Sequence, residues 1–190
     1  MGSPSTSSRD ASPVAQWTER VRQGDARAFE ALFRSLYPPL VRFAAGLAGE
    51  ADEADDLVQE AFVRLWERRA TLDPERSVRA LLYRTVRNLA YNRTRDRSRR
   101  RHLLESHEPP EASPRADVVL EARHTAEHLR RAVAALPERQ REAFLLTRVE
   151  GLSHTDVADV MGIAAATVNV HLVRALKTLR SSLGPSDLGP

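Results

Sequence analysis

The feature that most constrains the fold is the stretch of residues 152–180, which reads LSHTDVADVMGIAAATVNVHLVRALKTLR. A short helical pattern, a glycine and a longer helical pattern follow at the spacing of a helix-turn-helix. Ser153 can cap the first helix, and Gly162 can end it in the left-handed conformation that a sharp turn requires. Apolar side chains that would pack the helices together are Val157, Met161, Ile163, Val168 and Leu172. The pattern predicts a rigid second helix that can enter the major groove of DNA, with an ordinary helical hairpin as the alternative.

Composition excludes several other classes of protein. The 190 residues include no cysteine, which excludes disulfides, thiolate zinc sites and cysteine nucleophiles. No apolar run reaches the length of a membrane-spanning helix, and residues 1–13 contain no signal-peptide stretch. We therefore expect a cytoplasmic protein with no direct membrane insertion.

Charge is distributed unevenly along the chain. The formal net charge is +3 and the sequence pI is about 9.9. Residues 50–60 contain six acids and no base, whereas arginines dominate residues 76–101, where only Asp96 opposes them. An acidic and a basic segment favour different partners, and the basic one favours a polyanion.

Helical periodicity covers most of the chain and divides it into two parts. Apolar residues recur at threes and fours over residues 13–47, and interruptions at Gly24 and at Pro38 and Pro39 predict two or three helices there. Further helices are expected over residues 53–69, 78–101, 118–136 and 137–147. No segment has the two-residue period of a strand.

Residues 105–115, which read ESHEPPEASPR, have the proline-rich, aperiodic composition of a linker. The predicted fold is therefore all-α, with two small helical domains joined by a flexible linker and a helix-turn-helix in the second domain. The predicted parts are a disordered tail (1–12), a first domain (13–103), the linker (104–117), a second domain (118–183) and a C-terminal tail (184–190).

Enzyme motifs are nearly absent. Residues 124–128, HTAEH, fit the HxxEH pattern of a zinc peptidase, but no second helix supplies a further carboxylate ligand motif. The phosphate-binding and nucleophile-elbow patterns GxxxxGK[ST], GxGxxG and GxSxG do not occur. We expect no enzyme and no metal or cofactor, and a metallopeptidase is the alternative.

Two helices of the first domain are candidates for binding partners. Over residues 81–101, asparagines and tyrosines such as Tyr83 or Tyr91 lie among arginines, a pattern typical of a nucleic-acid-binding face. Its alternative is a solvated basic helix paired with the acids of residues 50–60. Residues 53–69 combine acids with more large apolar side chains than one helix face needs, which favours docking to a basic partner. The alternative is that Phe62 and Leu65 belong to the core.

In this order, the segments resemble those of the extracytoplasmic-function (ECF) sigma factors of bacterial RNA polymerase, in the sigma-70 superfamily. Residues 55–66, DDLVQEAFVRLW, resemble the region-two motif, residues 81–90, LLYRTVRNLA, resemble the helix after it, and the helix-turn-helix resembles region four. The resemblance covers about residues 14–183. It implies a promoter-specificity subunit that binds core RNA polymerase and directs initiation by recognising and melting promoter DNA. The alternative is a free-standing helix-turn-helix regulator without stable polymerase binding.

The resemblance also implies the binding residues. Those that would dock on the clamp coiled coil of the largest polymerase subunit are Asp55, Asp56, Leu57, Gln59, Glu60, Phe62 and Trp66. Those that would hold the melted minus-ten element are Arg76, Arg79, Arg84, Arg87, Asn88, Asn92 and Arg95. Those that would read the duplex minus-thirty-five element are Ala165, Ala166, Thr167, Asn169, Val170, His171 and Arg174. An anti-sigma protein is a further expected partner, and the alanine-rich reading face favours apolar or shape-dominated contacts.

Overall fold

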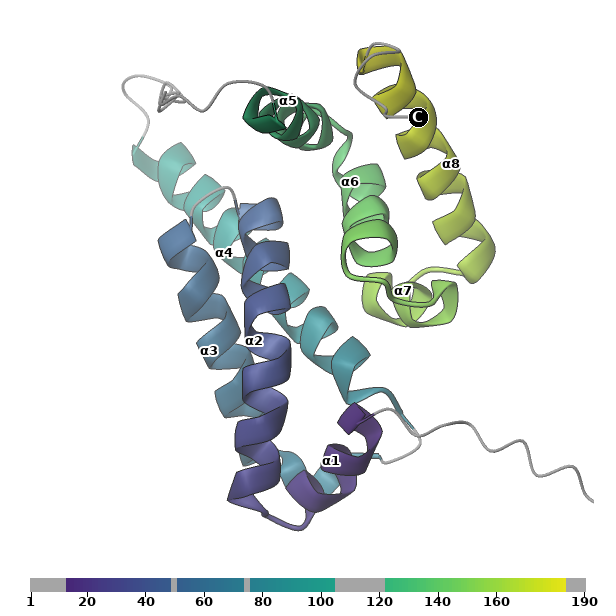
Figure 1. Ribbon diagram of the computed structural model, residues 1–190. Coiled ribbons are helices and arrows are strands. Elements are labelled where there is room, and N and C mark those ends of the chain that lie inside the picture. The colour runs from purple at the N-terminus through teal and green to yellow at the C-terminus, as the bar shows by residue number, and fades with distance from the viewer. Residues whose placement is uncertain (1–12, 49–50, 74–75, 105–121, 184–190) are drawn as a thin grey trace, which may run out of the picture. The chain divides into compact units, whose positions relative to one another are not determined.

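The computed structural model describes residues 13–48, 51–73, 76–104 and 122–183 (Figure 1). Every regular element in these ranges is a helix, which confirms the predicted all-α fold. The chain divides into two compact units, Met1–Ala90 and Tyr91–Pro190. Both predicted tails lie outside the described residues, and so do residues 105–121, which include nearly all of the predicted linker.

The described residues of the first unit form four helices and a short 3-10 turn. They are α1 (Pro13–Arg22), α2 (Ala26–Ala48), α3 (Ala51–Glu67), the turn η1 (Arg69–Thr71) and the first part of α4 (Val78–Leu104). α2 and α3 lie side by side (Figure 1). The largest fully buried apolar side chains of the unit are Tyr83, Phe43, Leu32, Leu40, Leu57, Leu82, Val21, Val58 and Val86. This core fixes the outward faces of α3 and α4.

The prediction that Pro38 and Pro39 interrupt a helix is wrong, because α2 continues through both. Each proline removes a backbone N–H and with it one intrahelical hydrogen bond. Leu36 and Leu40, on either side of the prolines, are buried at 4% and 0% exposure, whereas Pro38 is exposed. Burial of the apolar face therefore offsets the lost hydrogen bonds, and packing overrides the local preference.

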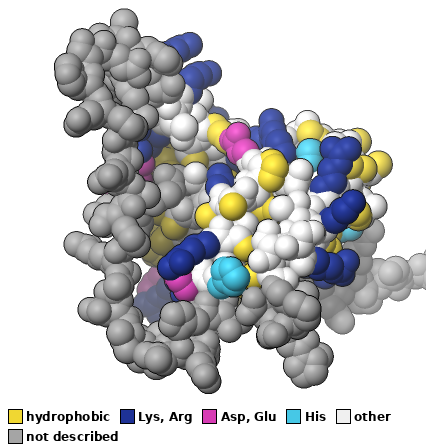
Figure 2. All heavy atoms as spheres, turned by 90° about the horizontal axis from the view of Figure 1, so that it is seen from above, with side chains coloured by type: hydrophobic (Ala, Val, Ile, Leu, Met, Phe, Trp, Pro, Cys, Tyr) yellow, Lys and Arg dark blue, Asp and Glu magenta, His cyan; other side chains and the backbone are white. Residues whose placement is uncertain are grey.

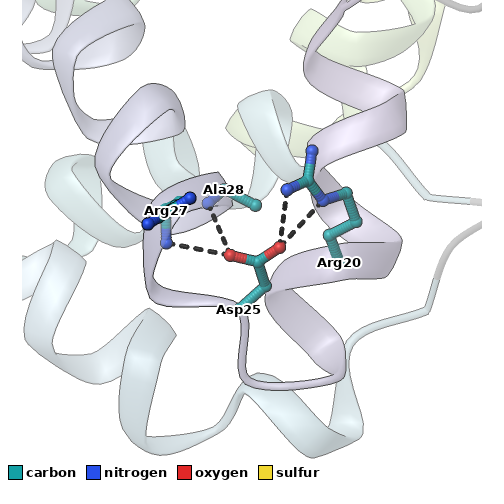
Figure 3. A network of polar contacts seen from close by, with 4 residues as sticks. All are labelled: Arg20, Asp25, Arg27 and Ala28. Atoms are coloured by element: carbon teal, nitrogen blue, oxygen red, sulfur yellow. Dashed lines mark hydrogen bonds and ion pairs between the residues drawn. The ribbon is translucent and has the colours of Figure 1, made fainter.

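A carboxylate caps the start of α2 (Figure 3). Asp25 Oδ1 accepts hydrogen bonds from the backbone N–H groups of Arg27 at 2.9 Å and Ala28 at 3.1 Å. Its Oδ2 accepts from Arg20 Nε at 2.9 Å, and Gly24 turns the chain just before it with φ of +86°. The cap satisfies two N–H groups that the helix leaves unpaired and ties α1 to α2.

The Asp25 cap predicts a pH-dependent contribution to stability. The backbone N–H of Ala28 and then the Arg20 guanidinium lower the pKa of the carboxyl below its ordinary range. Since the folded pKa lies below the unfolded one, the contribution is complete above about pH 4 and is lost as pH falls through the folded pKa. Asp25→Ala should lower the Tm at pH 7, and the difference from wild type should shrink in scans below about pH 4.

The matched control is Glu30→Ala, which removes only an exposed ion pair with Arg34 (2.6 Å). This control should change the Tm little, since exposed pairs within a helix contribute little. A Tm difference for Asp25→Ala that stays constant down to the lowest pH would contradict the assignment of the cap.

The second unit begins within α4, at Tyr91, and includes the helices that follow residue 121. Its elements there are α5 (Ala122–Ala134), α6 (Glu138–Phe144), the π-helical turn η2 (Leu145–Val149), α7 (His154–Met161) and α8 (Ala165–Ser182). The helix predicted over residues 137–147 is α-helical only to Phe144 and then widens, so that Glu150 N–H donates to the Leu145 carbonyl at 2.9 Å. One core cluster joins α8 to the chain before α6 and consists of Leu136, Ala175, Leu179 and Leu183.

Among the described residues, no single helix combines the length and hydropathy of a membrane span. α7 and α8 meet such a test only when taken together, across a bend of 98°.

Candidate protein and nucleic-acid interfaces

α7 and α8 form the predicted helix-turn-helix, with a bend of 98° between them. Ser153 Oγ caps α7 by accepting from the Asp156 N–H at 3.1 Å, and its hydroxyl donates to the Asp156 carboxylate at 2.7 Å. Gly162 ends α7 in the left-handed conformation with φ of +65°. Local capping and a single glycine thus produce the sharp turn that holds α8.

α8 has one buried face and one exposed face. The buried residues recur at fours and threes and are Val168, Leu172, Ala175 and Leu179. Six of the residues predicted to read duplex DNA are exposed, namely Ala165, Ala166, Thr167, Asn169, Val170 and Arg174. His171 is half-buried. The helix therefore has an exposed face over its first three turns that can enter a groove, while its other face is held in the core.

α4 presents a line of polar side chains, hereafter the polar line, which consists of Arg84, Asn88, Asn92 and Arg95. Their spacing of four, four and three residues places them along one side of the helix. Asn88, Asn92 and Arg95 are exposed and Arg84 is half-buried. The buried side of the same helix carries Val78, Leu82, Val86 and Leu89. Arg76, before the helix, is exposed, and Arg79, in its first turn, is half-buried.

Two side chains of α4 do not lie where their predicted roles require. Arg87 is only 9% exposed, and its guanidinium makes a long hydrogen bond of 3.5 Å to Asn88 Oδ1. Its burial argues against a phosphate contact. Tyr83 is 0% exposed beneath Arg79 and packs on Phe43, so it cannot stack on a base.

α3 presents an acidic outer face. Asp56 and Gln59 are exposed, whereas Asp55, Glu60 and Trp66 are half-buried. The prediction that Leu57 and Phe62 contact a partner is wrong for their side chains, which are only 1% and 2% exposed. They support the helix from the core, as the alternative interpretation held for Phe62. Leu65 is likewise buried.

The Asp55 carboxylate is held in place from two helices. The Tyr37 hydroxyl of α2 donates to Asp55 Oδ1, and Gln59 Nε2 donates to Asp55 Oδ2 at 2.6 Å. Burial, together with the hydrogen bond to Asp55, raises the pKa of Tyr37. The phenol therefore stays protonated and acts as a donor at neutral pH, which fixes the carboxylate before any partner arrives.

Aromatic side chains of α2 and α3 form a continuous cluster beside this carboxylate. Phe29, Phe33 and Tyr37 follow one another at intervals of four on α2 and are all half-buried. Ring centroids lie 4.9 Å apart for Phe29 and Trp66 and 4.7 Å apart for Phe33 and Phe62. The four-residue spacing on α2 was the available sequence signal, but the docking prediction included only α3.

Trp66 is itself fixed by Arg69 in the turn after α3. The guanidinium carbon lies 4.4 Å from the ring centroid, and Nη1 donates to the Trp66 carbonyl at 2.8 Å. One turn before the end of α3, Val63 is 56% exposed beside polar residues. The outer face of α3 thus joins carboxylates to apolar surface, which is the composition of a protein-binding site.

In the described ranges, no group of three or more histidine, aspartate or glutamate side chains is arranged to hold a metal ion. The HTAEH segment lies on α5. Together, a helix-turn-helix and a helix lined with arginine and asparagine define a DNA-binding protein.

The family described as Sigma-70 region 2 matches residues 32–100, and the family described as Sigma-70, region 4 matches residues 126–179. ECF RNA polymerase sigma factor EcfG of Rhodopseudomonas palustris is 34% identical over 156 residues, which cover 80% of this chain and 85% of the relative. ECF RNA polymerase sigma factor SigL of Mycobacterium tuberculosis is 31% identical over 170 residues, which cover 84% of this chain and 93% of the relative.

Solved structures show the same similarity. The sigma factor RpoE in complex with the anti-sigma factor NepR, from Bartonella quintana, matches with a TM-score of 0.68 and 26% identity over 83% of this chain and 97% of that one. CnrH in complex with the cytosolic domain of CnrY matches with a TM-score of 0.66 and 25% identity over 89% of this chain and 96% of that one.

The chain belongs to the ECF sigma factors of the sigma-70 superfamily. It is a promoter-specificity subunit that binds core RNA polymerase and directs transcription initiation by recognising and melting promoter DNA. The family consists of regulatory subunits, not enzymes. Matches to both regions in one chain favour this function over that of a free-standing regulator.

Proposed function

We propose that the two parts of the chain divide promoter recognition between them. Residues 13–103 dock on core polymerase and hold the melted minus-ten element, residues 104–117 are the linker, and residues 118–183 read the minus-thirty-five element as duplex. The observation that carries this division is the order of the two family regions along one helical chain. The chain has no catalytic role of its own, because RNA synthesis is the chemistry of the polymerase. It acts in the cytoplasm, where the chromosome lies.

Docking uses the outer face of α3. Asp56 and Gln59 are exposed. Glu60 is half-buried and forms an ion pair with Arg64, with 2.6 Å between Oε1 and Nη2. Carboxylates of this kind steer a basic partner and suppress wrong ones. The Arg69 guanidinium carbon lies 4.4 Å from the centroid of the Trp66 ring and holds it in place. Trp66 therefore supplies a rigid aromatic anchor at the end of the helix.

Tyr37 is the positioning residue for Asp55 in this docking site. Tyr37→Phe removes the hydrogen bond to the carboxylate but keeps the ring packed against Phe33, at 4.5 Å between centroids. The loss of one charged hydrogen bond corresponds to about 1.5 kcal/mol, or a core-polymerase affinity about tenfold weaker. The measurement is the Kd of labelled protein for core polymerase.

A double-mutant cycle separates this positioning role from general loosening of the fold. Once Asp55→Asn has removed the carboxylate, adding Tyr37→Phe should have little further effect. Additive losses of affinity would contradict the positioning role. Unfolding midpoints measured on the same variants identify any variant whose fold is impaired.

Melting of the minus-ten element depends on α4. Asn88 and Asn92 can donate to and accept from the edges of an unpaired base, while Arg84 and Arg95 at the two ends of the polar line neutralise phosphates. Arg76, just before the helix, and Arg79, in its first turn, act in the same way. Flipping a base out of the stack costs a few kcal/mol, which these contacts offset. The free energy gained when these residues bind the unpaired strand thereby favours opening of the duplex.

Inhibition is expected to act through a protein partner. The two solved relatives described above were each bound to another protein, the anti-sigma factor NepR in one case and the cytosolic domain of CnrY in the other. We infer an anti-sigma partner for this chain as well. Purification of the tagged chain from its native cell, followed by mass spectrometry, should recover both this partner and core polymerase.

A mobility-shift experiment tests the proposed function against a free-standing regulator. Duplex promoter DNA is incubated with the chain alone, with core polymerase alone and with both. Sequence-specific binding should require both proteins. Tight, specific binding to a palindromic duplex by the chain alone would instead identify a free-standing regulator.

A further inference from the structure

The exposed face of α8 carries an apolar strip, which consists of Ala166, Val170 and Val173. Val170 is 45% exposed and Val173 is 57% exposed, and both belong to the few large apolar side chains of the described residues that are exposed. Each residue of the strip lies two positions before a buried residue of α8, because the buried residues Val168, Leu172 and Ala175 have the same spacing of four and three. Two residues correspond to about 200° around a helix, so the strip lies opposite the core.

Basic residues continue the same side of the helix beyond the strip. Arg174, Lys177 and Arg180 are all exposed, and they lie in the C-terminal half of α8. Figure 2 shows one face of the molecule, on which arginine and lysine side chains lie among apolar and uncharged ones. The exposed side of α8 is therefore apolar in its first turns and cationic after them. Such a gradient fits DNA, because bases lie inside the groove and phosphates lie at its rim.

The chemistry of the strip selects among base pairs. Reading guanine in the major groove typically requires arginine or lysine at its O6 and N7 atoms, and the strip has neither. Its side chains offer only methyl groups, and the one apolar group that the major groove displays is the C5-methyl of thymine. Contact between the two removes apolar surface from water on both sides.

We propose that α8 reads the minus-thirty-five element at A·T pairs by packing Ala166, Val170 and Val173 against thymine methyl groups. Val173 thereby becomes a specificity-determining residue, and Arg174 and Lys177 hold the flanking phosphates. The inference rests on the proposed function, because it requires that α8 enters the major groove of promoter DNA.

The test removes the methyl groups from the DNA and leaves the protein intact. Holoenzyme, made from the full chain and core polymerase, first selects its upstream element from a library of randomised duplexes. Each thymine of the selected element is then replaced by deoxyuridine, which lacks only the C5-methyl. Burial of one such group corresponds to a factor of about four, so the affinity should fall about fourfold at each contacted thymine.

Valine variants connect the effect to the strip. Val170→Ala and Val173→Ala should reduce the difference between thymine and deoxyuridine, whereas Val149→Ala, at a 51% exposed site outside α8, should leave it unchanged. Lys177→Ala should weaken binding to both duplexes equally and lessen its salt dependence. Unfolding midpoints of all variants verify that the domain is folded.

The outcomes are distinguishable. If deoxyuridine has no effect at any position of a selected upstream element, thymine-methyl reading is wrong although the proposed function stands. If transcribing holoenzyme selects no upstream element, the role proposed for residues 118–183 is wrong as well. If the valine variants bind DNA like wild type but lose a protein partner, the strip is a protein-docking surface and the inference is overturned.

Discussion

Reversing the charge of Asp56 should weaken binding to core RNA polymerase on the order of thirtyfold, or ~2 kcal/mol. Asp56 is exposed at the centre of the acidic face of α3, and the buried residues Leu57 and Val58 beside it hold the helix in place. Asp56→Lys puts a like charge opposite a basic partner and retains good helix propensity. The measurement is the Kd for core polymerase at low and moderate salt, and the loss should be smaller at higher salt.

Glu30→Lys is the matched control for this reversal. Glu30 is an exposed acid on the neighbouring helix α2, with a side-chain exposure of 59%, and it lies away from the α3 acids in sequence. The same change in net charge at this site should alter the affinity by less than about twofold. Equal losses at Glu30 and Asp56 would show that total charge, and not a docking site on α3, determines the affinity.

Replacing the two asparagines of the polar line should reduce formation of the open promoter complex by about thirtyfold, since two hydrogen bonds of ~1 kcal/mol each would be lost. Asn88 and Asn92 are exposed and one helical turn apart. Asn88→Ala/Asn92→Ala removes both side-chain amides and keeps the buried apolar residues of α4, but it also removes the acceptor of the 3.5 Å hydrogen bond from Arg87. Permanganate reactivity of unpaired thymines reports strand opening directly.

Thr94→Ala is the control for this pair, because Thr94 is an exposed polar residue of the same helix outside the polar line. A promoter with a pre-opened minus-ten segment adds a second test. There the asparagine variant should still bind the cognate strand more weakly than wild type, whereas both proteins should bind a scrambled strand equally. If the defect disappeared on every pre-opened template, these asparagines would assist melting without reading bases.

The helix-turn-helix was predictable because its determinants are local. Ser153 and Asp156 are three residues apart, and Gly162 alone supplies the left-handed backbone that ends α7. Side-chain chemistry within one helical turn is what sequence patterns describe best. The same holds for the extents of α3 and α4, whose apolar residues recur at helical spacing.

Burial within those helices was less predictable. A periodic apolar stripe shows which face of a helix is apolar, but not whether Leu57 or Phe62 fills the core or meets a partner. The resemblance places Arg87 on a DNA-binding face and the residue pattern places Tyr83 there, but the packing of the first unit buries both. Their positions depend on contacts with other helices.

Contacts between distant residues were missed altogether. The hydrogen bond from Tyr37 to Asp55 joins residues 18 positions apart, on two different helices. The continuation of α2 through Pro38 and Pro39 likewise depends on the burial of Leu36 and Leu40, which local propensity does not describe. Long-range packing therefore determines the features that the sequence pattern alone could not predict.

Run-off transcription on a library of genomic fragments most directly tests the central claim that this chain gives core polymerase its promoter specificity. Core polymerase with the chain should produce a defined set of transcripts that core polymerase alone does not produce. Those transcripts should share an upstream and a downstream sequence element at fixed spacing. An unchanged transcript profile on adding the chain to active core polymerase would contradict the account.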